Sequence, residues 1–233
     1  MQEQSRPRAL LRLYSFWRSS ASYRVRIALN LKGLKYEYVP VHLTRDGGEQ
    51  NAAAYRALNP QGRVPLLADG DFRIAQSLAI LDYLEALQPG PALLPAEPRL
   101  RARMLAFCHA IVADIQPLQN TGPVKYLADH FGADEAGKAA WNRNWIQRGL
   151  EALEQERTLA MRAGVPDTAC AFGDAPTWAD CVLVPQVYNA ERWQCDVTKF
   201  PLLYRLAQRL RERPAFAAAL PERQPDAPGP AAA

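Results

Sequence analysis

A cluster of hydroxyl side chains stands at the turn between an apolar segment at residues 10–15 and an amphipathic segment at residues 22–31. Ser19 and Ser20 are expected to lie where this helix begins. A helix N-terminus presents unpaired amides and the positive end of the helix dipole, and both favour a bound anion. A hydroxyl that donates to a thiolate there stabilises the charged form and lowers the thiol pKa from its ordinary value of about 8.5. The competing interpretation is structural, because serine clusters are also common helix caps.

Two further segments have features that suit a bound peptide. Val64-Pro65 opens a strand after a turn, so it is a candidate for a cis bond, with main-chain groups of Val64 free to pair with an extended peptide. Gln76 and Ser77 open the next helix, a second N-terminal anion site that suits an α-carboxylate. Each feature alone is compatible with an ordinary strand or helix start. Their convergence on one strand-end surface, together with the serine turn, favours an anionic peptide.

Short strands and helices alternate in the first 90 residues and must position these groups. Apolar and β-branched patterns predict strands at 10–15, 36–41, 64–68 and 72–74, and helical periodicity predicts helices at 22–31, 52–58 and 77–87. Asp69-Gly70 between the last two strands indicates a hairpin. The second half is predicted to be helical throughout, with helices at 99–115, 135–159, 177–187 and 202–211. Thr177 and Asp180 form a capping box at one of these helix starts.

Proline and glycine mark the boundaries between these parts. We expect a disordered leader at 1–9, an α/β domain at 10–87, a proline-rich linker at 88–98, an all-helical domain at 99–220 and a disordered, proline-rich tail at 221–233. The fold class predicted from the pattern is therefore a small α/β domain followed by an all-α domain.

Composition excludes several classes of function. The net charge of +4 is concentrated in the first 26 residues, which carry six arginines and one glutamate, so nucleic acid is not expected as the main partner. No apolar run approaches the roughly 20 residues of a membrane span, and no signal peptide is readable. The four cysteines show no metal-ligand spacing, so we expect no metal site and a cytoplasmic protein.

Residues 19–29, Ser-Ser-Ala-Ser-Tyr-Arg-Val-Arg-Ile-Ala-Leu, resemble the signature of the zeta class of soluble glutathione transferases, usually Ser-Ser-Cys-x-Trp/His-Arg-x-Arg-Ile-Ala-Leu. Further segments that fit the class lie at 46–50, 57–60, 116–120, 183–186 and 189–192, the last followed by Asp196. The similarity runs from about residue 11 to residue 226. This class contains maleylacetoacetate isomerase and the bacterial maleylpyruvate isomerases.

The resemblance implies a thioredoxin-like first domain, a helical second domain, a homodimer, and glutathione as a cofactor that is not consumed. By position, Ser20 would activate the glutathione thiol, with Ser19 beside it. The residues that would contact glutathione are Gln50, Val64, Pro65, Gln76, Ser77, Gln116, Asn120 and, from a position that the maleylpyruvate group shares, His42. Arg18 and Arg192 would hold the carboxylates of an acidic substrate, although for any single arginine the sequence alone favours a surface position. His42 can equally be a half-exposed histidine at a strand end.

One position departs from the class, because Ala21 stands where cysteine is usual. That cysteine is not the cofactor thiol, so glutathione chemistry survives its loss. The implied activity is cis–trans isomerisation of maleylacetoacetate or maleylpyruvate in aromatic catabolism. Two alternatives stay open: a general glutathione transferase, which would accept uncharged electrophiles, and a glutathione-binding interaction module without turnover.

Overall fold

The computed structural model describes residues 10–229, so the predicted leader at 1–9 lies outside the described residues. The chain forms two compact units. The described residues up to Pro91, together with those from Ala215 onward, form the first unit, and Ala92–Pro214 form the second. The boundary after Pro91 falls inside the predicted linker, and the chain returns to the first unit at its C-terminal end.

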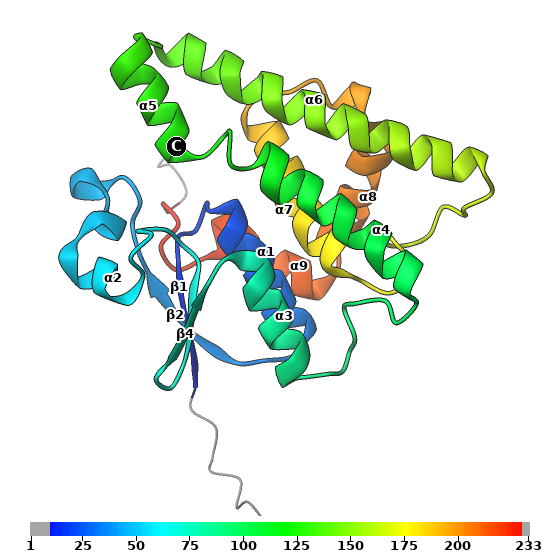
Figure 1. Ribbon diagram of the computed structural model, residues 1–233, viewed down its shortest axis with the longest axis horizontal. Coiled ribbons are helices and arrows are strands. Elements are labelled where there is room, and N and C mark those ends of the chain that lie inside the picture. The colour runs from blue at the N-terminus through cyan, green and yellow to red at the C-terminus, as the bar shows by residue number, and fades with distance from the viewer. Residues whose placement is uncertain (1–9, 230–233) are drawn as a thin grey trace, which may run out of the picture. The chain divides into compact units, whose positions relative to one another are not determined.

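A four-stranded sheet forms the centre of the first unit (Figure 1). Its strands are β1 (Leu11–Ser15), β2 (Tyr36–Pro40), β3 (Leu66–Asp69) and β4 (Phe72–Ala75), in the order β2-β1-β3-β4. Strand β1 pairs in parallel with β2 and antiparallel with β3, and β3 and β4 form the predicted hairpin. This mixed sheet confirms the thioredoxin-like expectation for the first half of the chain.

Three helices accompany the sheet: α1 (Ser20–Leu31), α2 (Ala53–Leu58) and α3 (Ser77–Leu87). Helices α1 and α3 pack side by side, and α2 lies on the other side of the sheet (Figure 1). Nine residues of α1 are buried, so apolar residues on more than one face of this helix contribute to the core. The helix begins two residues earlier than predicted, because Ser19 caps it.

The strand register brings three chain segments together at one end of the strands. Tyr14, near the end of β1, lies opposite Leu66 at the start of β3, and Leu66 lies opposite Ala75 at the end of β4. The segment after β1, the segment before β3 and the segment after β4 therefore all leave the sheet at the same end. These are the segments in which the sequence predicts binding residues.

The C-terminal segment is ordered, and the prediction of disorder from residue 221 is wrong for the described part. Helix α9 (Pro214–Ala218) is followed by the 3-10 turn η5 (Pro221–Arg223). Phe216 and Ala219 are fully buried, and Asn30 Nδ2 of α1 donates to Ala215 O at 2.9 Å. The prolines end helices here without preventing order, since buried apolar side chains anchor the segment to the first unit.

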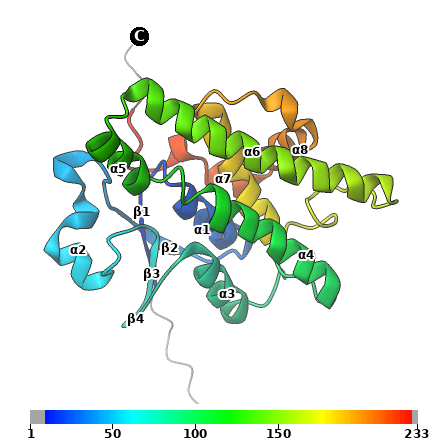
Figure 2. The ribbon, with the colours of Figure 1, turned by 45° about the horizontal axis from the view of Figure 1, so that its top comes forward.

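Helices make up the second unit: α4 (Pro98–His109), the π-helical turn η3 (Ala110–Ile115), α5 (Thr121–Phe131), α6 (Glu135–Arg162), α7 (Trp178–Arg192) and α8 (Pro201–Arg211). The long helix α6 runs past α7 and α8 (Figure 2). Helix α5 was not predicted, because Gly122-Pro123 suggests a turn. Pro123 lies in the first turn of α5, where no amide donor is needed. None of the helices among residues 10–229 is both long enough and apolar enough for a membrane span.

The predicted capping box at α7 is confirmed, and it is deeply buried. Asp180 is 0% exposed, and its carboxylate accepts from the Thr177 amide at 2.7 Å, the Thr177 hydroxyl at 3.0 Å and the Ala171 amide at 2.8 Å. Burial raises the pKa of Asp180, while these three donors act in the opposite direction. One carboxylate thus joins the start of α7 to the loop before it.

We predict that Asp180→Ala lowers the free energy of unfolding by about 3 kcal/mol, because two buried amides lose their acceptor. Equilibrium urea denaturation measures the change. Asp134→Ala is the matched control, since Asp134 accepts from the Gly137 amide at 2.7 Å at the exposed start of α6. The control should lose about 1 kcal/mol. Equal losses in the two variants would contradict the importance of burial.

Candidate functional site

Two serines occupy different positions at the start of α1. Ser19 is the N-cap, and its hydroxyl accepts from the Ser22 amide at 3.2 Å. Ser20 is the first residue of the helix and is 8% exposed. Within the described part of the chain, no hydrogen bond uses the Ser20 hydroxyl, which leaves it able to donate to a ligand. Ser19 thus builds the helix start, and Ser20 offers a hydroxyl there.

The loop before α1 is held by a buried cation. Arg26 is fully buried, and its guanidinium donates to Ser15 Oγ at 3.3 Å, Phe16 O at 3.5 Å, Trp17 O at 3.0 Å and Ala219 O at 3.2 Å. Burial lowers the pKa of Arg26. These bonds fix the main chain between β1 and Ser19. Arg26 therefore has a structural role and does not face a ligand.

A second buried cation stands behind the start of α3. Arg24 is also fully buried, and its Nη1 donates to Ser77 Oγ at 3.2 Å. Because Ser77 accepts from Arg24, its own hydroxyl proton remains available to an anion. The positive end of the α3 dipole and the Arg24 charge act on the same place. Two sources of positive potential therefore meet at the α3 N-terminus.

Gln76 has an unusual backbone. Its φ is +71°, in the left-handed region that non-glycine residues rarely adopt. Such a conformation costs about 1–3 kcal/mol and tends to occur at functional sites. The exposed side chain donates through Nε2 to Gln61 Oε1 at 2.9 Å. The contact with Gln61 was not foreseen from the sequence, and only the meeting of two loops reveals it.

Val64 lies just outside the sheet, because β3 begins at Leu66, two residues later than the start of the predicted strand at 64–68. The Val64–Pro65 peptide is cis, and Leu66 is the first residue of β3 in the ladder. The main chain before Val64 is fixed, because two side chains donate to Arg63 O: Tyr55 Oη at 2.7 Å and Asn59 Nδ2 at 2.7 Å. The main chain that leads into Val64 is therefore held rigidly.

His42 lies two residues after β2 and is half-buried. Its Nδ1 accepts from the Arg45 amide at 2.8 Å and the Thr44 amide at 3.3 Å. An accepting Nδ1 places the proton of the neutral ring on Nε2. Glu49 Oε2 accepts from the His42 amide at 2.7 Å and completes this loop. The imidazole thus organises its own loop, and a ligand contact of Nε2–H stays a prediction.

Gln50 holds a buried acceptor. Its Nε2 donates to Leu43 O at 3.3 Å, and its Oε1 is buried without a partner among the described residues. An unpaired buried acceptor is costly, so a donor from a ligand would stabilise it. Gly48 makes this arrangement possible, since its φ is +97° and a Cβ there would lie 2.3 Å from Gln50 Nε2. The sequence by itself predicted no role for Gly48.

The remaining predicted residues are distributed over both units. Gln116 and Asn120 belong to the second unit, on the segment after η3, where Trp141 Nε1 donates to Leu118 O at 2.7 Å. Arg192 also belongs to the second unit and is exposed at the end of α7, with its guanidinium 4.7 Å from the centroid of a neighbouring indole. Arg18 belongs to the first unit. The structure therefore brings the serine turn, Val64-Pro65 and Gln76-Ser77 to the same end of the strands. Gln116, Asn120 and Arg192 lie in the second unit.

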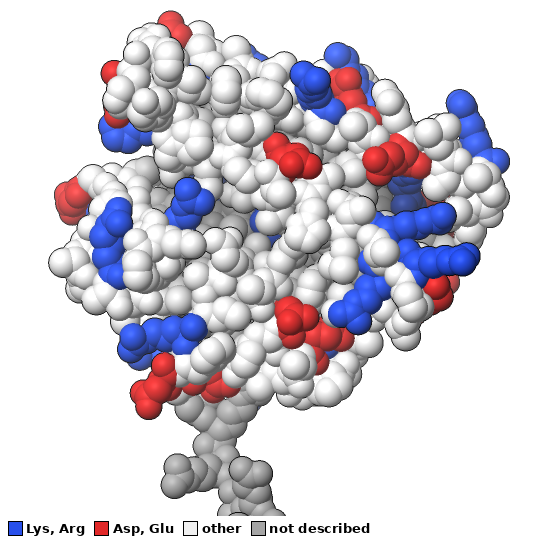
Figure 3. Space-filling model, viewed as in Figure 1, with Lys and Arg blue, Asp and Glu red and all other residues white. Residues whose placement is uncertain are grey.

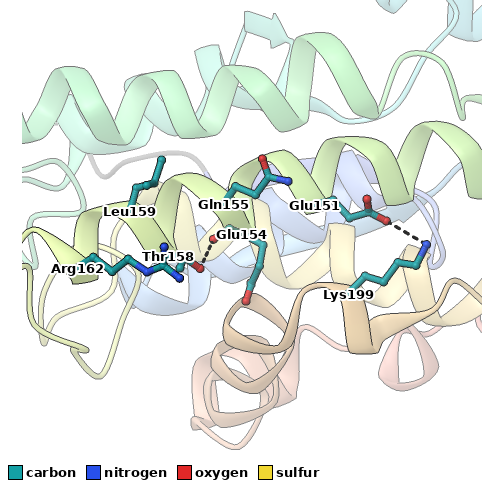
Figure 4. Close-up of a pocket in the computed structure, with 7 residues that line it drawn as sticks. All are labelled: Glu151, Glu154, Gln155, Thr158, Leu159, Arg162 and Lys199. Atoms are coloured by element: carbon teal, nitrogen blue, oxygen red, sulfur yellow. Dashed lines mark hydrogen bonds and ion pairs between the residues drawn. The ribbon is translucent and has the colours of Figure 1, made fainter.

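A pocket of about 520 Å³ lies in the second unit and contains none of the predicted residues (Figure 4). It is lined by Glu151, Glu154, Gln155, Thr158, Leu159, Arg162 and Lys199. Lys199 pairs with Glu151 at 3.6 Å, and the Glu154 carboxylate accepts from the Leu202 amide at 2.8 Å. Because these carboxylates serve the helical packing, we assign the pocket no catalytic role. On the face seen in Figure 3, basic and acidic side chains are interspersed without a continuous basic stripe.

The protein's own thiols are unsuited to act as nucleophiles. All four cysteines are free and buried. Burial raises the pKa of Cys170 to about 11 and that of Cys195 to about 11. At neutral pH only about one in ten thousand such thiols is ionised. Among the described residues, no group of His, Cys, Asp and Glu forms a metal-binding cluster.

We predict that iodoacetamide modifies Cys170 and Cys195 at least about 100-fold more slowly in the folded protein at pH 7 than in urea, because both thiols are buried and protonated. Mass spectrometry of timed samples measures the rates. The rate in the folded protein should rise with pH up to about 11. Rapid labelling of either thiol at pH 7 would contradict this assignment.

Comparison with known proteins follows the division of the chain. A model described as "Glutathione S-transferase, N-terminal domain" matches residues 13–92, and one described as "Glutathione S-transferase, C-terminal domain" matches residues 143–214. The chain is 46% identical to a probable maleylacetoacetate isomerase of Vibrio cholerae, over 92% of this chain and 97% of that protein.

Solved structures show the same similarity. The holo structure of a maleyl pyruvate isomerase, a bacterial zeta-class protein, has a TM-score of 0.87 and 45% identity, covering 93% of this chain and 100% of that chain. A maleylacetoacetate isomerase from Methylobacterium extorquens AM1, with bound malonate and GSH, has a TM-score of 0.87 and 39% identity, covering 94% and 100%. The resemblance found in the sequence is confirmed: this chain belongs to the glutathione S-transferase family, in its zeta class.

Proposed function

We propose that this protein is a glutathione-dependent cis–trans isomerase that acts on maleylacetoacetate or maleylpyruvate. The observation that carries the proposal is that three features lie at the same end of the strands: a free Ser20 hydroxyl, the main chain of Val64 and the α3 N-terminus. Similar proteins named as isomerases of these two acids support the choice of reaction.

The residues present fit glutathione. Its γ-glutamyl carboxylate suits the α3 N-terminus, where Ser77 retains a hydroxyl proton and Arg24 supplies charge. Its extended main chain suits the unpaired segment at Val64, as in strand addition. The buried Oε1 of Gln50 requires a donor, which an amide of the tripeptide can supply. Three features of different chemistry thus match three parts of one molecule.

When bound, glutathione would supply a thiolate nucleophile for reversible addition to the substrate alkene, which would allow rotation about the former double bond. Ser20 donates a hydrogen bond to that sulfur, which favours its ionised form together with the α1 dipole. Arg18 and Arg192 are proposed to hold the two substrate carboxylates. Gln116 and Asn120 are proposed to contact glutathione from the helical unit, and His42 from the loop after β2.

An absorbance assay with maleylacetoacetate and with maleylpyruvate tests the proposed reaction. We expect isomerisation of at least one acid, dependent on added glutathione, and little conjugation of uncharged electrophiles such as chlorodinitrobenzene. Preference for the uncharged acceptor would indicate a general transferase. Binding of glutathione without turnover of any acceptor would indicate an interaction module.

We predict that Ser20→Ala lowers kcat by about 100-fold and changes the Kd of glutathione by less than about threefold, because the hydroxyl acts on the sulfur and the other contacts hold the tripeptide. Steady-state kinetics and calorimetric titration measure the two quantities. Ser22→Ala is the matched control: Ser22 is buried on the same turn, and its hydroxyl has no partner among the described residues. An unchanged kcat in Ser20→Ala would remove the role given to this residue.

We also propose that the protein is a cytoplasmic homodimer, as its class implies. Four free, buried cysteines support a reducing compartment. Light scattering coupled to size-exclusion chromatography gives the mass in solution, and a monomer at micromolar concentration would contradict the dimer.

A further inference from the structure

The C-terminal segment carries a carboxylate, that of Asp226, which contacts the loop before α1. Asp226 Oδ2 accepts from the Trp17 amide at 3.0 Å, and Asp226 Oδ1 accepts from Tyr38 Oη of β2 at 2.6 Å. Trp17 is 209 positions away in the chain. The contact therefore joins the last part of the described chain to the turn that carries Ser19 and Ser20.

This contact completes the fixation of a very short loop. Between the end of β1 and the cap Ser19, the Phe16 carbonyl accepts from the Ser19 amide at 3.0 Å. The Arg26 guanidinium donates hydrogen bonds to the carbonyls of Phe16 and Trp17. The Trp17 amide points to a different partner, which is Asp226. Arg26 thus holds the carbonyl of the Phe16–Trp17 peptide unit, and Asp226 holds its amide.

The position of Asp226 is itself well determined. Arg26 Nε donates to Ala219 O at 3.2 Å, and Gln224 Nε2 donates to Ala218 O at 3.1 Å and Leu220 O at 2.8 Å. The segment before Asp226 is therefore anchored by buried groups. The Asp226 charge also opposes the effect of burial on the pKa of Arg26, so that the carboxylate stabilises the cation that holds the other side of the loop.

We propose that Asp226 is a positioning residue, which fixes the main chain at Trp17 and thereby holds Ser20 where it reaches the cofactor sulfur. The inference rests on the proposed function of Ser20 and goes beyond it, since it makes the C-terminal segment a part of the catalytic architecture. A displacement of about 1 Å at a reacting group can lower a rate by about 100-fold, so a small movement of this loop is sufficient for an effect.

The experiment compares four variants with the wild-type protein: Asp226→Ala, Asp226→Asn, Tyr38→Phe and Arg223→Ala. Asp226→Ala removes both contacts, and Asp226→Asn keeps the shape and one accepting oxygen. Tyr38→Phe removes one hydroxyl and leaves the bond to Trp17. Arg223 is exposed on the same segment, so Arg223→Ala is the control for a general disturbance of the tail.

Two readouts separate positioning from stability. The first is kcat and KM with the better of the two acids, and the second is the ultraviolet absorbance of the thiolate of bound glutathione as a function of pH. For Asp226→Ala we expect kcat to fall about tenfold, KM to change by less than about twofold, and the thiol to ionise about one pH unit higher. Asp226→Asn should lie between this variant and wild type. Tyr38→Phe and Arg223→Ala should keep the wild-type kcat within about twofold.

A merely structural role would lower the melting temperature of Asp226→Ala and leave its thiol titration and kcat unchanged, and this result would overturn the proposal. If Asp226→Ala does not fold, the isosteric Asp226→Asn decides the question by the same readouts. A wild-type protein that ionises bound glutathione without isomerising either acid would refute the proposed reaction, while the thiol titration of the variants would still test Asp226. Failure of the wild-type protein to bind glutathione would overturn both.

Discussion

The burial of Arg26 is the constraint on which the geometry of the first unit depends. A guanidinium that is buried away from water is stable only when its N–H groups donate hydrogen bonds to protein acceptors, because an unsatisfied buried charge is strongly unfavourable. Here the acceptors are Ser15 Oγ and three carbonyls from the loop and the C-terminal segment. The end of β1, the start of α1 and a segment about 190 residues away are therefore tied to one side chain. The loop that carries the serines has little freedom as a result.

A local positive field follows from the same arrangement. Helix α1 follows β1 and helix α3 follows β4, and the register places the ends of these two strands at the same end of the sheet. The N-termini of both helices therefore start there. Arg24 lies behind the second of these helix starts and binds Ser77. Glutathione and a dicarboxylic substrate are both anions, so they gain from helix dipoles and buried cations in one place. The net charge of +4 is small, and its placement matters more than its size.

Local patterns were sufficient for much of the fold. The strands, α1, α3 and the capping box at α7 were predicted because hydrophobic periodicity and capping residues act over a few positions. Helix α5 and the ordered C-terminal segment were missed, since Gly122-Pro123 and the later prolines suggest breaks when read alone. Phe216 is fully buried against the first unit, and no local pattern shows that burial. Long-range packing thus overrode local propensity at the C-terminal segment, whereas α5 forms because a proline in the first turn of a helix removes no hydrogen bond.

The candidate site divides in the same way. Ser19, Ser20, Val64 and the Gln76-Ser77 pair were visible in the sequence by themselves, because hydroxyls and amides at helix and strand starts have a recognisable chemistry and a family signature. The left-handed backbone of Gln76, the carbonyl contacts of Arg26 and the bond from Trp17 to Asp226 were decided only by the tertiary structure. Hydrogen-bond partners separated by about 200 residues leave no local trace, since the chain must fold before they meet.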